Sequence, residues 1–106
     1  MEKIWIKNYP AGIPAEIDLT QYQSLMEIYD ESIKKFPNHK AFTNMGVSLT
    51  FTELDQRVCQ FASFLQNELK LKKGDRIAIQ MPNVLQFPVV AFAALRVGLT
   101  LSLIHI

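Results

Sequence analysis

Residues 71–83 read LKKGDRIAIQMPN, a polar turn followed by a short apolar run and a proline. The run Ile77-Ala78-Ile79 lacks the alternation of a strand with one solvated face, so it indicates a strand buried on both faces. Gly74 allows the turn into this strand, which we expect to run from Arg76 to Met81, and Pro82 ends it. Such a strand is typical of a parallel sheet covered by helices.

A helix is expected on each side of this strand. The helix before it has one apolar stripe, spaced as helical residues are, made of Leu54, Val58, Phe61, Ala62, Leu65 and Leu69. Thr52 is its expected N-cap, with Asp55 three residues later. The helix after the strand is expected over about residues 85–96. Pro88 falls in its first turn and Gly98 stops it.

An earlier helix and a hairpin complete the pattern. Ser24 and Glu27 have the spacing of a capping box, and they precede an amphipathic stretch. Two short strands, at residues 41–44 and 48–51, are joined through Gly46 and form a hairpin. The order of elements predicts an α/β domain with a partly parallel sheet. Because that sheet needs more strands than the chain supplies, the pattern is that of an incomplete domain.

Three segments are distinguished along the chain. Residues 1–23 have no period and are broken by Pro10, Gly12 and Pro14, so we expect an extended amino-terminal arm. Residues 24–100 hold the predicted helices and strands and form the partial domain. Residues 101–106 read LSLIHI, which suits an edge strand by its alternation. The same six residues are also the in-frame translation of CTGTCTCTTATACACATC, a transposon end used in sequencing libraries. We favour read-through of that adapter, which makes the tail non-native.

Composition excludes several classes of function. The chain has 106 residues and a formal net charge of +1, so it lacks the basic excess of nucleic-acid-binding proteins. Its single cysteine excludes an internal disulfide and a multi-cysteine zinc site. The amino terminus has no apolar run of a signal peptide. The uncharged stretch 77–95 is interrupted by Pro82 and Pro88, which favours a buried strand, turn and helix over a membrane span.

No catalytic, cofactor-binding or metal-binding residue is predicted in this chain. The four glycines, at positions 12, 46, 74 and 98, are too far apart for a phosphate-binding loop. His39 lies in a polar turn, and neither it nor His105 has a second ligand beside it. Cys59 is expected to be a partly buried packing thiol. Lys70, Lys72 and Lys73 are expected to form a solvated face after a helix end.

Several short runs nevertheless resemble one family in order and spacing. They are residues 3–5 (KIW), 8–10 (NYP), 14–18 (PAEID), 50–54 (TFTEL), 71–78 (LKKGDRIA), 81–83 (MPN) and 95–98 (LRVG). Together they resemble the opening of bacterial long-chain fatty-acid–CoA ligases, which belong to the adenylate-forming, AMP-binding superfamily. In that family these runs build the beginning of a large amino-terminal domain of layered α/β architecture, and their roles are structural. The resemblance therefore implies that the chain is the incomplete start of such a domain.

The resemblance implies an activity for a longer parent protein. Such a parent converts a fatty acid, ATP and coenzyme A to acyl-CoA, AMP and pyrophosphate through an acyl-adenylate, with Mg²⁺. The phosphate loop, the acidic adenylate-site motifs and the mobile-domain lysine of the family have no counterpart here. The 106-residue chain is therefore expected to be inactive alone and to need the missing remainder of its domain. The resemblance also implies a cytoplasmic protein, with peripheral contact at the inner membrane and a homodimer of the parent as open options.

Two alternatives stay open. The chain could be a small non-catalytic module that binds a partner or a membrane surface through its apolar carboxy-terminal half. It could also be a fragment of another adenylate-forming enzyme, such as an aryl-CoA ligase or a peptide-synthetase adenylation domain. Acyl-chain preference is set by residues that this sequence does not contain.

Overall fold

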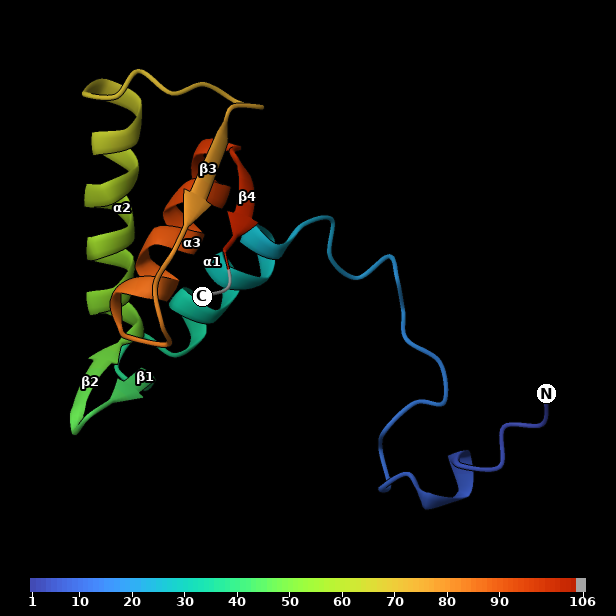
Figure 1. Ribbon diagram of the computed structural model, residues 1–106. Coiled ribbons are helices and arrows are strands. Elements are labelled where there is room, and N and C mark those ends of the chain that lie inside the picture. Colours follow the sequence, from blue (N-terminus) through green and yellow to red (C-terminus); the bar gives the residue numbers. More distant parts are fainter. Residues whose placement is uncertain (105–106) are drawn as a thin grey trace.

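Three helices pack beside two small sheets in residues 1–104, the part of the chain that the computed structural model describes (Figure 1). A short 3₁₀ helix, η1, precedes them in the arm. The elements in chain order are η1 (Ile6–Asn8), α1 (Leu25–Lys35), β1 (Lys40–Asn44), β2 (Val47–Thr50), α2 (Phe51–Asn67), β3 (Arg76–Ile79), α3 (Gln86–Val97) and β4 (Thr100–Leu103). The predicted order of helices and strands is confirmed.

Helix α1 begins where its capping residues predict. The backbone N–H of Glu27 donates to Ser24 Oγ over 3.2 Å, which satisfies one of the unpaired donors of the first turn. The Glu27 carboxylate reaches one residue further back than a capping box requires and accepts from the backbone N–H of Gln23 at 2.8 Å. On the apolar face of the helix, only Tyr29 is fully buried. Leu25 and Ile28 are exposed.

The hairpin is confirmed, but the start of α2 is two residues earlier than predicted. Strands β1 and β2 are antiparallel, and Met45 and Gly46 both have positive φ at the turn between them, as a type I′ turn requires. Thr50, not Thr52, caps α2. Its hydroxyl accepts from the backbone N–H of Glu53, whose carboxylate accepts from the backbone N–H of Thr50, a complete capping box.

Phe51 and Thr52 therefore have different structural roles from those predicted. Phe51, expected at the end of a strand, is the first residue of α2. The hydroxyl of Thr52 donates to the carbonyl oxygen of Pro37 at 2.8 Å, so it ties the start of α2 to the end of α1. Both threonines are suitable N-cap residues, and Thr50, which is followed three residues later by Glu53, is the one that caps the helix.

The apolar stripe of α2 is the centre of the core. Leu54, Val58, Ala62 and Leu65 are buried, and Phe61 packs against them while partly exposed. Helix α3 contributes Ala93, Ala94 and Val97 to the same core, and the small alanine side chains let the two helices approach closely. Leu69, counted in the predicted stripe, lies beyond the end of α2 and is 52% exposed.

Strands β3 and β4 form a parallel pair with α3 as the crossover between them. Arg76 pairs with Thr100, and the register continues to Ile79 and Leu103. Strand β3 ends at Ile79, two residues before the predicted end at Met81. The prediction that both faces of β3 are buried is wrong for this chain: Ile79 is buried but Ala78 is exposed, because α3 covers only one face of the pair.

Pro88 and Gly98 lie at the start and the end of α3. Pro88 lies in the first turn, where its missing N–H breaks no helical hydrogen bond. Gly98 has φ of 85°, the left-handed conformation of a helix C-terminus, and its N–H donates to the carbonyl of Leu95. Both predictions are confirmed, and the chain turns directly from α3 into β4.

The arm extends away from the helices (Figure 1). Within it, Lys3 pairs with Glu16, and the side chain of Asp18 accepts hydrogen bonds from Thr20. Helix η1 packs against no other element among the described residues, and Trp5 is 44% exposed. None of the helices within residues 1–104 has the length and apolarity needed to cross a bilayer.

The suspected tail begins inside β4. Leu101, Ser102 and Leu103 pair with β3, as the edge-strand interpretation expects, while 105 and 106 lie outside the described residues. Because a backbone ladder accepts almost any side chains that alternate suitably, this pairing fits a native strand and an adapter-derived one equally.

The capping box of α2 gives a first prediction. Thr50→Ala should lower the free energy of unfolding by about 1 kcal/mol, because it leaves the N–H of Glu53 without its acceptor. Thr50→Ser keeps the hydroxyl and should stay within a few tenths of a kcal/mol of the parent. Urea unfolding followed by circular dichroism measures both, and equal losses would show that the threonine methyl group matters rather than the oxygen.

Candidate functional site

The titratable residues considered from the sequence lie apart from one another. His39 is exposed in the turn after α1, where its ring and that of Phe36 are nearly perpendicular. His105 lies outside the described residues. Cys59 is exposed on α2, so the prediction of a partly buried thiol is wrong. Its position lies just outside the apolar stripe of the helix. Within residues 1–104, no three histidine, cysteine, aspartate or glutamate side chains gather as metal ligands do.

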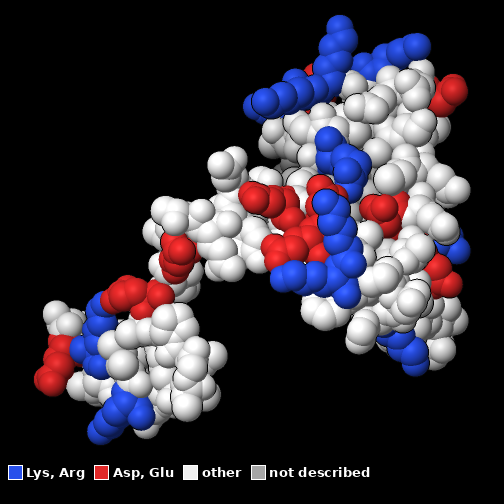
Figure 2. Space-filling view, turned by 180° about the vertical axis from the view of Figure 1, so that it is seen from behind, with Lys and Arg blue, Asp and Glu red and all other residues white. Residues whose placement is uncertain are grey.

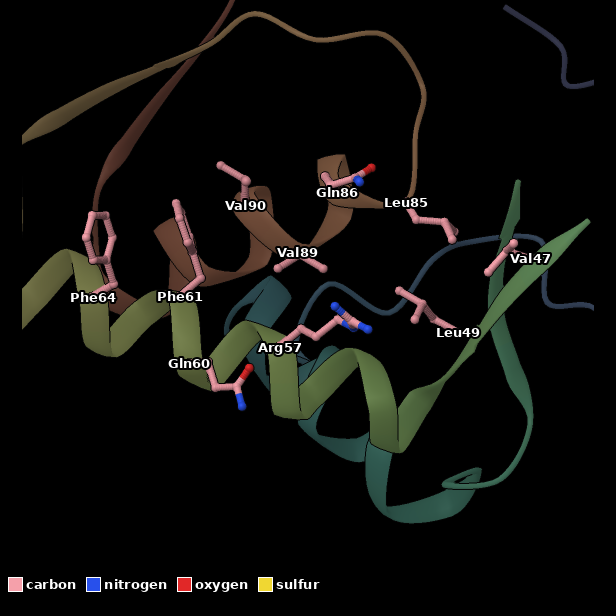
Figure 3. A pocket seen from close by; sticks show the side chains of 10 residues that line it. All are labelled: Val47, Leu49, Arg57, Gln60, Phe61, Phe64, Leu85, Gln86, Val89 and Val90. Atoms are coloured by element: carbon pink, nitrogen blue, oxygen red, sulfur yellow. The ribbon is translucent and has the colours of Figure 1, made fainter. Parts of the chain in front are cut away.

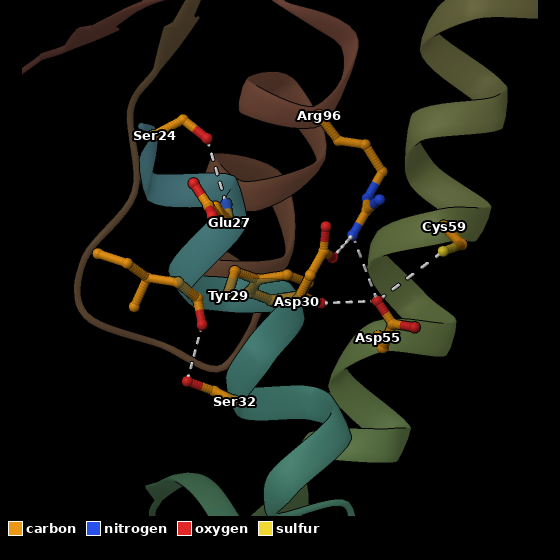
Figure 4. Close-up of polar contacts among 9 residues, drawn as sticks. Ser24, Glu27, Tyr29, Asp30, Ser32, Asp55, Cys59 and Arg96 are labelled. Carbon is orange, nitrogen blue, oxygen red and sulfur yellow. Dashed lines mark hydrogen bonds and ion pairs between the residues drawn. The ribbon is translucent and has the colours of Figure 1, made fainter. Parts of the chain in front are cut away.

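The structure instead brings together a polar cluster from all three helices (Figure 4). Arg96 of α3 donates from Nη2 to Asp30 Oδ1 of α1 at 2.9 Å and lies 3.7 Å from Asp55 Oδ1 of α2. The Tyr29 hydroxyl donates to the same Asp55 oxygen at 3.0 Å. The guanidinium carbon of Arg96 lies 5.5 Å from the centre of the Tyr29 ring, within reach of a cation–π interaction.

The electrostatics of this cluster favour one fixed protonation state. Burial, followed by the hydrogen bond to Asp55, holds the pKa of the Tyr29 hydroxyl well above its usual range. Burial is the largest single influence on Arg96 and works against its charge, but the hydrogen bond to Asp30 and the nearby charges, chiefly that of Asp30, together raise the pKa of the guanidinium. Because both groups keep their protons near neutral pH, neither readily donates a proton to a substrate or accepts one from it. The cluster therefore acts as a structural clasp between α1, α2 and α3.

Cys59 lies at the border of this cluster, where its thiol donates a long hydrogen bond to Asp55 Oδ1, with 3.9 Å between the sulfur and the oxygen. Sequence reasoning did not identify the clasp. Tyr29, Asp55 and Arg96 are each ordinary residues on amphipathic helices, and no sequence spacing links positions so far apart.

An apolar groove opens between α2 and α3 (Figure 3). Its volume is about 540 Å³, and β2 closes one end. It is lined by Val47, Leu49, Arg57, Gln60, Phe61, Phe64, Leu85, Gln86, Val89 and Val90. Arg57 is the only charged residue of this lining, and no pair of acid and base faces it. The groove can take up apolar side chains or a lipid-like chain, but its lining offers no residues for group transfer.

The clasp generates the second prediction. Tyr29→Phe removes the hydrogen bond to Asp55 and keeps the ring, whose centre lies 4.7 Å from that of Phe92. We expect the free energy of unfolding to fall by about 1 kcal/mol at neutral pH. Tyr9→Phe, in the exposed arm, is the matched control and should be neutral.

The parent chain and Tyr29→Phe should also differ in how their stability depends on pH. Because folding raises the pKa of Tyr29 above its ordinary 10.0, its contribution to stability is complete below pH 10 and is lost as pH rises through the folded-state pKa. The parent chain should therefore lose more stability above pH 10 than Tyr29→Phe. Parallel pH profiles for the two would contradict the assignment.

The sequence is similar to those of several curated proteins. Curated relatives include the long-chain-fatty-acid–CoA ligases of Haemophilus influenzae, 46% identical over 99 residues, and Yersinia pestis, 48% identical over 99 residues. The ligase of Bacillus subtilis is 34% identical over 97 residues. The first two matches cover 93% of this chain but only 18% of the relatives, so the chain spans less than a fifth of their length.

Solved structures share the fold. The N-terminal subdomain of Klebsiella oxytoca NpsA superposes with a TM-score of 0.75 at 26% identity, covering 79% of this chain and 22% of that one. A fused adenylation–PCP di-domain of NpsA with ThdA gives a TM-score of 0.71. These matches confirm the predicted α/β start of an adenylate-forming domain. The profile of the AMP-binding enzyme family matches residues 29–106, and the chain therefore belongs to the AMP-binding enzymes.

Proposed function

We propose that this chain is the opening segment of a long-chain fatty-acid–CoA ligase. The whole protein activates a fatty acid with ATP and Mg²⁺, forms an acyl-adenylate and pyrophosphate, and transfers the acyl group to coenzyme A. The observation that carries the proposal is the 46–48% identity to bacterial long-chain ligases over nearly the whole chain. That matched region includes most of the amino-terminal arm, which lies outside the match to the general family profile.

The role of the segment itself is to build one corner of the catalytic domain. Its turns, caps and clasp hold three helices and a parallel strand pair, and the residues that handle ATP and the acyl group belong to later parts of the ligase. We place the whole protein in the cytoplasm, with peripheral contact at the membrane from which its substrate comes. A homodimer is a further option, because the arm exposes Trp5 to a second subunit.

A peptide-synthetase adenylation domain is the second candidate, favoured by the structural likeness to NpsA. The fold is common to both kinds of enzyme, so it does not separate them. The identity does: NpsA is 26% identical where the long-chain ligases reach 46–48%. An acetyl-coenzyme A synthetase of Arabidopsis thaliana matches only 62% of the chain, at 40% identity.

Exchange of labelled pyrophosphate into ATP tests the activity of the full-length protein. We expect exchange to depend on long-chain fatty acids such as oleate and to be absent with amino acids or benzoate. Release of AMP with oleate should require coenzyme A for turnover. Exchange supported by an amino acid or an aryl acid, and not by oleate, would move the protein to one of the other branches. The 106-residue chain alone should give no exchange.

The carboxy-terminal six residues have their own test. Long-read, adapter-free sequencing across the codon for Thr100 should show a frame that departs from LSLIHI and continues into an asparagine-containing strand. Later in the frame we expect a loop rich in Ser, Thr and Gly. A stop codon directly after Ile106 in genomic DNA would refute adapter read-through and leave the ligase as the ancestor of a short protein.

A further inference from the structure

Helix α1 is the least firmly packed of the three helices. It buries only Tyr29 fully, whereas α2 and α3 each bury four residues. Leu25 and Ile28 on its apolar face are exposed. Met26 and Ile33 pack against the core but are only partly buried. Because tertiary packing of an apolar face supplies most of the stability of a helix, α1 is held less strongly by packing than its neighbours are.

A cavity of about 220 Å³ lies between α1 and the rest of the helical body. The wall formed by α1 consists of Leu25, Ile28, Tyr29 and Ser32, and the opposite walls consist of Ala41, Phe42, Phe51, Leu54 and Phe92. Side chains that border such a space have no partner atoms on that side and lose dispersion contacts. Over this stretch α1 is therefore not closely packed against the hairpin or α2.

The two ends of α1 are held differently. Beyond its C-terminal end, the carbonyl oxygen of Pro37 accepts hydrogen bonds from the backbone N–H and the hydroxyl of Thr52, at 3.0 and 2.8 Å. Phe36, between the helix and this anchor, has left the helical conformation, with φ of −129° and ψ of 47°. At its other end α1 continues into the arm, which stands clear of the helical body in Figure 2. A helix anchored only at its C-terminal end can pivot there.

The clasp holds the middle of α1 to the helical body (Figure 4). Within residues 1–104, the side chains of α1 form hydrogen bonds to the other helices only through Tyr29 and Asp30. Their partners are Asp55 of α2 and Arg96 of α3. The side chains of Asp30 and Arg96 are 51% and 32% exposed, so water can replace this ion pair at a small cost in free energy.

We propose that residues 1–35, the arm and α1, form a latch that opens as one unit about Phe36 and Pro37 while α2, α3 and both sheets stay folded. The clasp keeps the latch closed. Opening exposes the apolar walls of the cavity on the hairpin, α2 and α3, so the clasp controls access to that surface. Such an opening is a sub-global unfolding step, with a free energy below that of unfolding the whole chain. The proposal does not rest on the ligase activity.

Hydrogen exchange of single amides in the 106-residue chain, at low and increasing urea concentration, tests the latch. Amides of α1 should exchange faster than those of α2 and α3. Their exchange should depend only weakly on urea, because opening the latch exposes little surface, whereas exchange in α2 should follow global unfolding and rise steeply.

Two variants separate latch opening from global unfolding. Thr50→Ala weakens α2 whether the latch is closed or open, so it should speed exchange in α2 about five-fold and leave α1 unchanged. Arg96→Gln removes the ion pair with Asp30, which is made only in the closed state. It should speed exchange in both helices about five-fold, because latch opening and global unfolding both break the clasp.

Arg57→Gln is the matched control. It removes the same charge from an exposed position on α2 that forms no ion pair within residues 1–104, and it should leave exchange in α1 unchanged. Equal opening free energies and urea slopes for α1 and α2 in the parent would overturn the proposal. So would faster exchange in α1 on Thr50→Ala, or the absence of any protection in α1. None of these outcomes depends on fatty-acid activation.

Discussion

The parallel pairing of β3 with β4 is the constraint on which the rest of the structure depends. Parallel strands cannot be joined by a tight turn, so the chain must return along a crossover, and α3 is that crossover. An apolar helix lying on the strand pair needs a cover on its other side, which α2 supplies through its buried stripe. Arg96, on the last turn of the crossover, then fixes α1 through Asp30.

How far sequence predicts such a structure depends on the range of each interaction. Ser24, Pro88 and Gly98 act within one helical turn, so their roles could be read from a few neighbouring residues, and the structure confirms them. The start of α2 was harder, because Thr50 and Thr52 both precede an acidic residue at capping distance. Glu53 completes the capping box on Thr50, while the hydroxyl of Thr52 donates to the carbonyl of Pro37, which lies 15 positions earlier in the chain.

The clasp shows where sequence reasoning stops. Arg96 and Asp30 are 66 residues apart, and their contact depends on how three helices pack rather than on any local pattern. The prediction for Cys59 fails for another reason: its position borders the apolar stripe of α2, and the helix turns it to solvent. Local rules predict which residues begin, end and face inward on an element. They do not predict which polar side chains meet when separate elements pack.

The exposed apolar surface has a physical explanation in the length of the chain relative to its family. Ala78 on the open face of the sheet and Leu103 on β4 have the residue types of a covered sheet, and the described residues cover only one side of it. A chain that spans 18% of its relatives supplies the first layer of such a domain and few of its neighbours.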